Sequence, residues 1–254
     1  MSLLVSLHNL SMLRPIAVLL CLIPACVSAN EAAIRKILEP MLGGARIEAV
    51  EPAPVAGLFE VRVQTAEGLR ILYTDATGAY IVQGSIVEPR TGRDLTEEKL
   101  RKLSAIKFES LPLERAVTIK RGNGRRVLAM FSDPYCPACK QFEGALQQVE
   151  DITIHVFMFP VIRPALAEHS SAVWCARDRG TAWLDLVLRG KRPGANTACA
   201  NPIERNLELG RSLRVNATPT LILANGERYS GGLPIPELTK LLDQAAASQS
   251  SRPR

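Results

Sequence analysis

Two cysteines separated by two residues, in Cys136-Pro137-Ala138-Cys139, constrain this chain more than any other feature. An apolar run over 127–131 predicts a buried strand just before them, and apolar residues at helical spacing follow them. The first sulfur of such a pair lies near the free amides and the positive end of the helix, which stabilise its thiolate. The second sulfur, one helical turn on, can close a disulfide with the first. Pro137 suits the first turn, where no amide hydrogen bond is lost. The pattern therefore indicates a redox-active dithiol.

Two other uses of this cysteine pair are weaker interpretations. Half of a zinc site would need two further ligands at finger-like spacing, but Cys175 follows 36 residues after Cys139, and Cys199 another 24 after that. A purely structural disulfide within so short a loop would constrain the unfolded chain little. We therefore expect neither a metal nor another cofactor. The net charge of +6 comes from basic residues spread along the chain, so a nucleic-acid partner is not expected either.

The first residues predict export. Arg14 precedes an apolar run over 15–24, and small residues ending at Ala29 follow, which is the pattern of a secretory signal peptide over 1–29. A lipoprotein anchored through Cys26 is the weaker alternative, because the residues before this cysteine make a poor lipobox. Cleavage after Ala29 leaves four cysteines, and an even number in an exported protein implies oxidised pairs.

Residues 30–90 carry the pattern of a small domain. An amphipathic helix opens it, and alternating strand patterns then predict a small antiparallel sheet with strands at 59–63, 71–73 and 80–82. The segment holds too few apolar residues for an independent core. We therefore expect it to bury one face against something else.

A linker helix is predicted within 91–110, with Asp94 as its N-cap and apolar residues at helical spacing to Phe108. A second domain should occupy 111–247, and a disordered tail 248–254. The patterns in this domain predict strands 117–119 and 127–131 paired across a Gly-Asn-Gly turn, a buried strand over 152–159, helices from Pro164 to Leu213, a hairpin around Asn225-Gly226 and a last helix over 236–246.

Thr218-Pro219 stands directly before the apolar strand that begins at Thr220. A proline at the first residue of a strand is permitted, but Thr-Pro at this place in the order of elements resembles the cis-proline loop that faces the dithiol of thioredoxin-like proteins. Only about 5–6% of X-Pro bonds are cis, so the prediction of a cis bond rests on this position. Met130 stands where thioredoxin-type chains often carry a buried acid, and no carboxylate proton relay is expected at that position.

Together these segments resemble the DsbC and DsbG family of periplasmic disulfide isomerases. The resemblance lies in the linker helix and in five segments, Pro52–Gly57, Ile81–Gly84, Phe131–Cys136, Trp174-Cys175-Ala176 and Ala217-Thr218-Pro219. It implies an α+β and α/β architecture: a small cystatin-like N-terminal dimerisation domain, a linker helix and a C-terminal thioredoxin-like domain with a helical insertion.

Further expectations rest on this resemblance. It implies a homodimer in the periplasm of a Gram-negative bacterium, with misfolded exported proteins as substrates and a membrane thiol reductase of the DsbD type as partner. It also implies a nucleophilic Cys136, a structural disulfide between Cys175 and Cys199, and active-site neighbours at Pro137, Ala138, Thr218 and Pro219.

The dipeptide between the cysteines departs from the family, because Pro137-Ala138 replaces Gly-Tyr or Pro-Tyr. This dipeptide tunes the redox poise, so three functions stay open. Disulfide isomerase is the leading one. A DsbG-like reductase of sulfenylated cysteines would use the same two sulfurs on a different electrophile. In a chaperone-like dimer, the cleft would do the main work and redox chemistry would be secondary.

Overall fold

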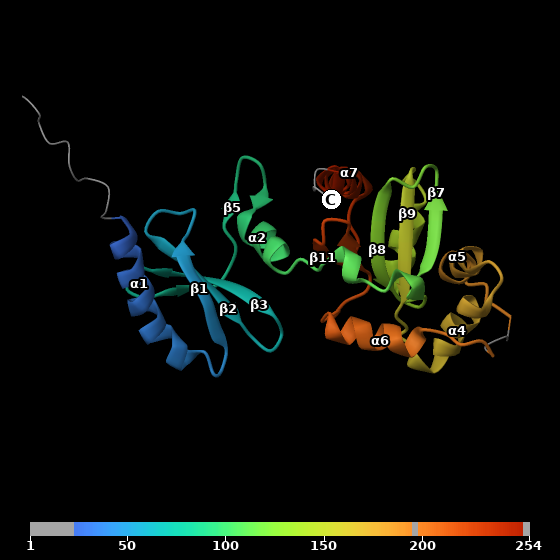
Figure 1. Cartoon of the computed structure of the whole chain (residues 1–254), viewed down its shortest axis with the longest axis horizontal. Coiled ribbons are helices and arrows are strands. Elements are labelled where there is room, and N and C mark those ends of the chain that lie inside the picture. Colours follow the sequence, from blue (N-terminus) through green and yellow to red (C-terminus); the bar gives the residue numbers. More distant parts are fainter. Residues whose placement is uncertain (1–22, 195–197, 251–254) are drawn as a thin grey trace, which may run out of the picture. The chain divides into compact units, whose positions relative to one another are not determined.

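The computed structural model describes residues 23–194 and 198–250 (Figure 1). The chain divides after Gly84 into two compact units, with residues 67–69 grouped with the second. Within the described ranges, no helix is both long enough and apolar enough to cross a membrane. Most of the predicted signal peptide lies outside these ranges.

The first unit consists of a helix and a four-stranded sheet. Helix α1 (Ile23–Leu38) begins upstream of Ala29, and a short 3-10 helix (Glu39–Met41) follows it. The strands β1 (Arg46–Pro52), β2 (Leu58–Gln64), β3 (Leu69–Asp75) and β4 (Ile81–Val82) lie side by side in this order. One core joins the helix to the sheet, with Ile34, Leu38, Ile47, Val50, Phe59, Val61 and Val63 buried. The predicted antiparallel sheet is confirmed.

Strand β1 has no counterpart among the predicted strands. Its pairing with β2 shifts register between Ile47 and Ala49, a β-bulge that places two residues opposite one. Ile47 and Val50 are therefore both buried although they are three residues apart. The bulge breaks the alternation by which a strand is recognised in a sequence.

The second unit opens with a small hairpin and a helix. Strands β5 (Val87–Glu88) and β6 (Arg93–Asp94) pair antiparallel and lead into α2 (Leu95–Leu103). Asp94 is the N-cap, and its carboxylate accepts the Glu97 amide at 2.8 Å. The prediction that this helix continues to Phe108 is wrong. The Ser104 hydroxyl donates to the Leu100 carbonyl at 2.6 Å, and the chain then leaves the helix and forms a 3-10 turn at Phe108–Ser110.

A five-stranded sheet forms the centre of the second unit, in the order β11-β10-β8-β9-β7. The strands are β7 (Val117–Arg121), β8 (Arg126–Ser132), β9 (Ile152–Met158), β10 (Thr220–Leu223) and β11 (Arg228–Ser230). Strands β8 and β9 run parallel, joined by helix α3 (Pro137–Leu146), and the other pairs are antiparallel.

The predicted pairing of the strands on either side of the Gly-Asn-Gly turn is wrong, because β9 lies between β7 and β8. Asp151, at the start of β9, holds the turn in this arrangement. Its carboxylate accepts the Asn123 amide at 2.9 Å, and its carbonyl accepts the Arg126 amide at 2.9 Å. The Asn225-Gly226 hairpin between β10 and β11 is confirmed.

Helices cover both faces of this sheet (Figure 1). Helices α4 (Ala167–Cys175), α5 (Arg179–Arg189) and α6 (Ile203–Ser212) form the predicted helical insertion, and α7 (Ile235–Ser250) ends the described chain. The larger core lies where α3, α5 and α7 meet one face, and the smaller one lies on the other face around Phe131, Phe157 and Phe159.

The predicted tail is shorter than expected, because residues 248–250 still belong to α7. The Ser248 hydroxyl donates to the Ala245 carbonyl at 2.8 Å and continues the helical turn. Residues 251–254 lie outside the described ranges.

Candidate functional site

A buried aspartate fixes the loop that delivers the dithiol. Strand β8 ends at Ser132, and Asp133 is fully buried in the loop before α3. Its carboxylate accepts the Tyr135 amide at 2.7 Å, and also the amides of Val161 and Ile162 at 2.6 and 2.7 Å, just beyond β9. Asp133 therefore ties the active loop to a second loop. In the sequence it was visible only as part of a family motif.

Cys136 occupies the N-cap position of α3, followed by Pro137 in the first turn. Its thiol donates to the Thr218 carbonyl at 3.3 Å. Burial raises the pKa of this thiol, but hydrogen bonds from the Thr218 side chain, from Cys139 and from the Ala138 amide outweigh burial, and the pKa lies below its ordinary value. Cys136 is thus the sulfur that forms a thiolate more readily.

Cys139 has the opposite character. Its side chain is fully buried, whereas Cys136 is 6% exposed. Burial raises the pKa of Cys139 to about 12, against hydrogen bonds from the Asp133 backbone and the Ser132 side chain that favour its thiolate. Both cysteines are free thiols in the structure. The two sulfurs therefore divide into a reactive outer thiol and a protonated inner thiol.

The Thr218-Pro219 loop lies against the outer sulfur. The bond between these residues is cis, which confirms the prediction from its position in the order of elements. The Pro219 carbonyl accepts the Gly231 amide at 2.7 Å, and the Thr220 hydroxyl donates to the Ala217 carbonyl at 2.6 Å, so both ends of the loop are held. The structure thus places Thr218 at the Cys136 sulfur, with Pro219 following it in the chain.

The solvent side of the dithiol is open and partly apolar. Pro137 and Ala138 are exposed, and so are Val161 and Ile162, at 42% and 52%. Since Asp133 accepts the amides of the last two residues, their loop is anchored beside the dithiol. An exposed apolar surface therefore lies next to the dithiol.

Behind the dithiol lies a carboxyl that sequence reasoning missed. Glu143 on α3 is 1% exposed, and its Oε1 accepts the Ser132 hydroxyl at 3.1 Å and the Trp183 indole N–H at 2.9 Å. Burial raises the pKa of Glu143 to about 7, although these hydrogen bonds and the charge of Arg121 favour ionisation. Helical spacing could have revealed it, because Glu143 follows Cys139 by one turn and shares its buried face.

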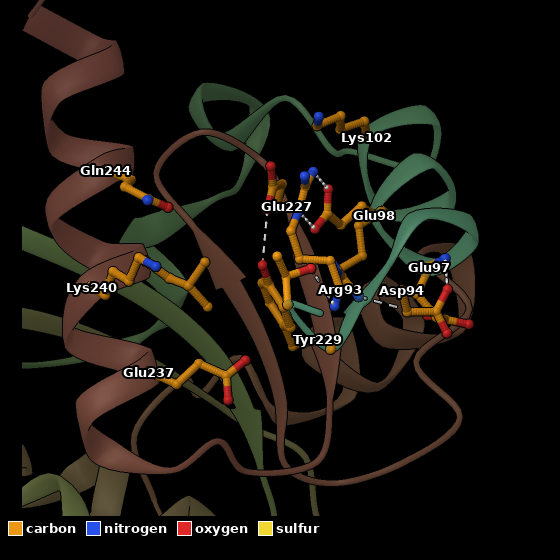
Figure 2. A pocket seen from close by; sticks show the side chains of 14 residues that line it. Arg93, Asp94, Glu97, Glu98, Lys102, Glu227, Tyr229, Glu237, Lys240 and Gln244 are labelled. Atoms are coloured by element: carbon orange, nitrogen blue, oxygen red, sulfur yellow. Dashed lines mark hydrogen bonds and ion pairs between the residues drawn. The ribbon is translucent and has the colours of Figure 1, made fainter. Parts of the chain in front are cut away.

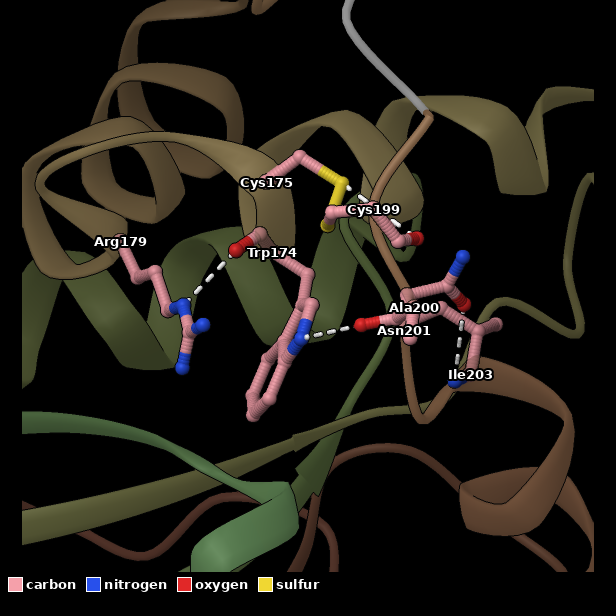
Figure 3. Close-up of a disulfide and its surroundings, with 7 residues drawn as sticks. All are labelled: Trp174, Cys175, Arg179, Cys199, Ala200, Asn201 and Ile203. Atoms are coloured by element: carbon pink, nitrogen blue, oxygen red, sulfur yellow. Dashed lines mark hydrogen bonds between the residues drawn. A yellow bond between two sulfur atoms is a disulfide. The ribbon is translucent and has the colours of Figure 1, made fainter.

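The other two cysteines form a separate disulfide, shown in Figure 3. Cys175 at the end of α4 joins Cys199 across 24 residues, with their Cα atoms 5.7 Å apart. The neighbouring Trp174 indole donates to the Ala200 carbonyl at 3.1 Å, and the Arg179 guanidinium stacks on the indole ring at 3.8 Å. The bridge therefore fastens the segment before α6 to the end of α4.

A second hollow in this unit has a different character (Figure 2). It is lined by side chains of β6, α2, β11 and α7, including the ion pair of Arg93 with Glu98 at 2.7 Å and Tyr229, whose hydroxyl donates to Glu227 at 2.9 Å. No residue of the dithiol or of its facing loop lines it. Among the described residues, no group of three or more His, Cys, Asp and Glu side chains is placed to hold a metal ion.

Comparison with known proteins finds a matching family domain in each half of the chain. Residues 25–97 match the model of the disulfide bond isomerase protein N-terminal domain, and residues 113–246 match that of the thioredoxin-like domain. The chain is 37% identical to the probable thiol:disulfide interchange protein DsbC of Bordetella pertussis over 81% of its length and 72% of that protein. It is 29% identical to the DsbC of Escherichia coli strain K12, over 85% of its length and 89% of that protein.

A solved structure supports the catalytic unit. The crystal structure of a disulfide interchange protein from Neisseria gonorrhoeae superposes with a TM-score of 0.51 at 36% identity, covering 54% of this chain and 99% of that one. The expected fold class, an N-terminal family domain followed by a thioredoxin-like domain with a helical insertion, is confirmed. These two domains, with the Cys136–Cys139 dithiol in the second and 37% identity over 81% of the chain, show that the chain belongs to the DsbC family of thiol:disulfide interchange proteins.

Proposed function

We propose that the protein is a periplasmic disulfide isomerase that rearranges non-native disulfides in exported proteins of a Gram-negative bacterium. The observation that carries the proposal is the contrast between its two thiols. Cys136 has a lowered pKa and faces the Thr218 loop, whereas Cys139 is buried with a pKa of about 12. Attack on a disulfide requires a thiolate, so the first step belongs to Cys136.

In the proposed cycle, the Cys136 thiolate attacks one sulfur of a wrong disulfide and forms a mixed disulfide, releasing the other sulfur as a thiolate. A different thiol of the substrate then attacks the mixed disulfide, which completes isomerisation and regenerates Cys136. Alternatively, Cys139 attacks, and the substrate leaves reduced. A membrane thiol reductase of the DsbD type would then return the dithiol to its reduced form.

The remaining site residues take supporting roles in this proposal. The Thr218-Pro219 loop orients the substrate chain at the sulfur, and Pro137 and Ala138 form the exposed rim of the helix. The disulfide between Cys175 and Cys199 is structural. A DsbG-like reductase of sulfenylated cysteines and a chaperone-like dimer are less favoured, because the relatives compared above carry the name DsbC.

We further propose that the unit within 30–90 forms a homodimer through β4, with 91–110 linking it to the catalytic domain of 111–247. Strand β4 is the edge of its sheet, and its apolar side chains are exposed, Ile81 at 38% and Val82 at 51%, as is Tyr80 just before it at 76%. An apolar, unpaired edge favours pairing with another strand. A twofold axis would pair the same edge of two copies.

Reactivation of scrambled ribonuclease tests the isomerase function. Cys136→Ala should abolish reactivation, whereas Cys139→Ala should retain part of it and accumulate mixed disulfides. The double variant Cys175→Ala, Cys199→Ala is the matched control and should stay active at a temperature where it is folded. Reactivation by Cys136→Ala at the wild-type rate would refute the proposal, and rescue of a cysteine-free client by this variant would favour the chaperone-like alternative.

The dimer is tested in the full-length chain by sedimentation of Val82→Lys. A lysine on the β4 edge should oppose strand pairing and yield a monomer. Val87→Lys is the matched control, because Val87 is similarly exposed, at 47%, but lies on β5. A wild-type monomer, or a dimer unaffected by Val82→Lys, would contradict the proposed interface.

A further inference from the structure

The buried Glu143 carboxyl has no role in the cycle described so far. A carboxyl group is costly to bury even when it is hydrogen-bonded, so packing alone does not explain why this chain keeps one behind its dithiol. Glu143 lies one helical turn after Cys139 on the same face of α3, and both side chains are almost fully buried.

Ser132 connects the two groups. It is the last residue of β8 and is fully buried. Its hydroxyl donates to Glu143 Oε1 at 3.1 Å. Ser132 also lies close enough to the Cys139 side chain to favour its thiolate. A hydroxyl has one proton to give and two lone pairs to accept with, so it can take a proton from a thiol while passing its own to a carboxylate. The three groups therefore form a continuous path from the inner sulfur to the carboxyl.

The surroundings of Glu143 suit a proton acceptor. On α5, Trp183 is fully buried and donates its indole N–H to the same Oε1 at 2.9 Å, which holds the carboxyl in place. On β7, Arg121 supplies the positive charge that acts on Glu143, and its guanidinium also donates to the Val149 carbonyl at 3.2 Å. Among the described residues, these groups, Ser132 and the Cys139 thiol beyond it are the polar and titratable neighbours that act on Glu143.

We propose that Glu143, acting through Ser132, accepts the proton of Cys139 when Cys139 attacks the mixed disulfide. The Cys139 thiol transfers its proton to the Ser132 hydroxyl, which transfers its own proton to the Glu143 carboxylate. The Cys139 sulfur then forms a bond to Cys136 Sγ, and the bond from Cys136 Sγ to the substrate sulfur breaks. The substrate leaves as a thiolate, and its former disulfide has gained the two electrons that the dithiol has lost.

The reverse proton transfer serves the return step. When an external thiolate attacks Cys136 in the oxidised enzyme, Cys139 is the leaving group, and Glu143 can return its proton to the departing sulfur through Ser132. Thioredoxin-type chains often carry a buried acid at the strand position that Met130 occupies here. In this relay the acid lies on the active-site helix instead. Proton transfer by a positioned group contributes about 10²–10⁴ in rate, which sets the scale of the expected effect.

This inference rests on the proposed roles of Cys136 and Cys139, and the experiment separates the two. Enzyme carrying glutathione on Cys136 is prepared, and glutathione release by Cys139 is followed against pH in the wild type, Glu143→Gln and Ser132→Ala. We expect wild-type release to show an inflection near pH 7, the pKa of Glu143. Both variants should release glutathione at least tenfold more slowly at pH 8 and lack that inflection.

Alkylation of Cys136 in the reduced enzyme provides the internal control. Its pH midpoint should change little in either variant, because Ser132 and Glu143 act on Cys139. Glu150→Gln, an exposed acid beyond the end of α3, should leave both steps unchanged. If both variants release glutathione as fast as the wild type and keep the inflection, the relay is overturned. If Cys136 is unreactive in the wild type, the proposed function is overturned instead.

A second readout needs no variant of the relay itself. The indole of Trp183 donates to Glu143, so its fluorescence reports on the charge of that carboxyl. In Trp174→Phe, which leaves Trp183 as the chain's sole tryptophan, emission should titrate with a midpoint near 7 in the reduced enzyme, the pKa of Glu143. A flat signal from pH 5 to 9 would show that Glu143 does not change charge there and would overturn the relay.

Discussion

Removal of the disulfide between Cys175 and Cys199 should destabilise the second unit through its unfolded state. Cys199 is exposed and Cys175 is only half-buried, so Cys175→Ala with Cys199→Ala removes little buried surface. The bridge joins residues 24 apart. A loop of that length restricts the unfolded chain by about 3.5 kcal/mol at 25 °C in the chain-entropy model. The hydrogen bond from Trp174 to Ala200 at 3.1 Å remains to hold the native segment.

Urea unfolding followed by tryptophan fluorescence measures this change directly. Both tryptophans, Trp174 and Trp183, belong to the second unit, so the signal is not affected by the first. With Cys136 and Cys139 alkylated in both proteins, no thiol exchange can occur. We expect the free energy of unfolding to fall by about 3.5 kcal/mol and the melting temperature by about 7–14 °C for a unit of this size.

The slope of the unfolding free energy against urea distinguishes the mechanism. If the bridge acts by restricting the unfolded chain, its removal lets that chain expand, and the slope should increase. Wild-type protein in which the Cys175–Cys199 disulfide has been reduced should behave like the variant. A loss below about 1 kcal/mol, well under the chain-entropy value, would refute the reasoning. If the unfolding free energy falls by the full expected amount but its slope against urea is unchanged, the bridge acts by stabilising the native state instead.

Three further results are expected. Thr218→Val removes a hydrogen bond that lowers the pKa of the nucleophilic thiol, so the pH midpoint of its alkylation should rise; an unchanged midpoint would contradict this. Gly210→Ala would bring a Cβ within 2.7 Å of Phe159 Cζ, and urea unfolding should show a loss of about 1–3 kcal/mol, whereas the helical control Gly144→Ala meets only ordinary contacts and should lose nothing. The pKa of Glu143 is raised from 4.5 to about 7, so ionisation of this group lowers stability as the pH rises through that window. Unfolding titrations should show that Glu143→Gln removes about 3 kcal/mol of the pH dependence of stability between pH 4.5 and 8. Parallel pH curves for the two proteins would argue against a raised pKa.

The sequence by itself determined the local chemistry of the dithiol. The strand and the two cysteines with Pro137 at the start of a helix are short-range patterns, which short-range sterics and helix capping control. The cis Thr218-Pro219 bond was predictable only from its place in the order of elements. The Asn225-Gly226 hairpin follows from the same kind of rule, because Gly226 adopts a φ of +89° that favours glycine.

Pairing between distant strands depended on tertiary structure. The Gly-Asn-Gly turn gives no signal that β9, some 30 residues later, would lie between the strands it joins; Asp151 makes that arrangement by bonding to the turn. Strand β1 was hidden because its bulge breaks the alternation. In both cases the decisive contacts come from residues far apart in the chain, and no local pattern encodes them.

Glu143 shows the same division at the site itself. In the sequence, a glutamate after Phe142 on a helix is most simply a solvated side chain, because glutamate is seldom fully buried. Only the folded chain brings Ser132, 11 residues away, and Trp183, 40 residues away, to the same carboxyl oxygen and removes water from it. The pKa of a buried acid depends on what surrounds it in three dimensions. Residue identity and spacing could therefore locate the two sulfurs and place Glu143 on the same face of α3, but they could not show that this acid is buried.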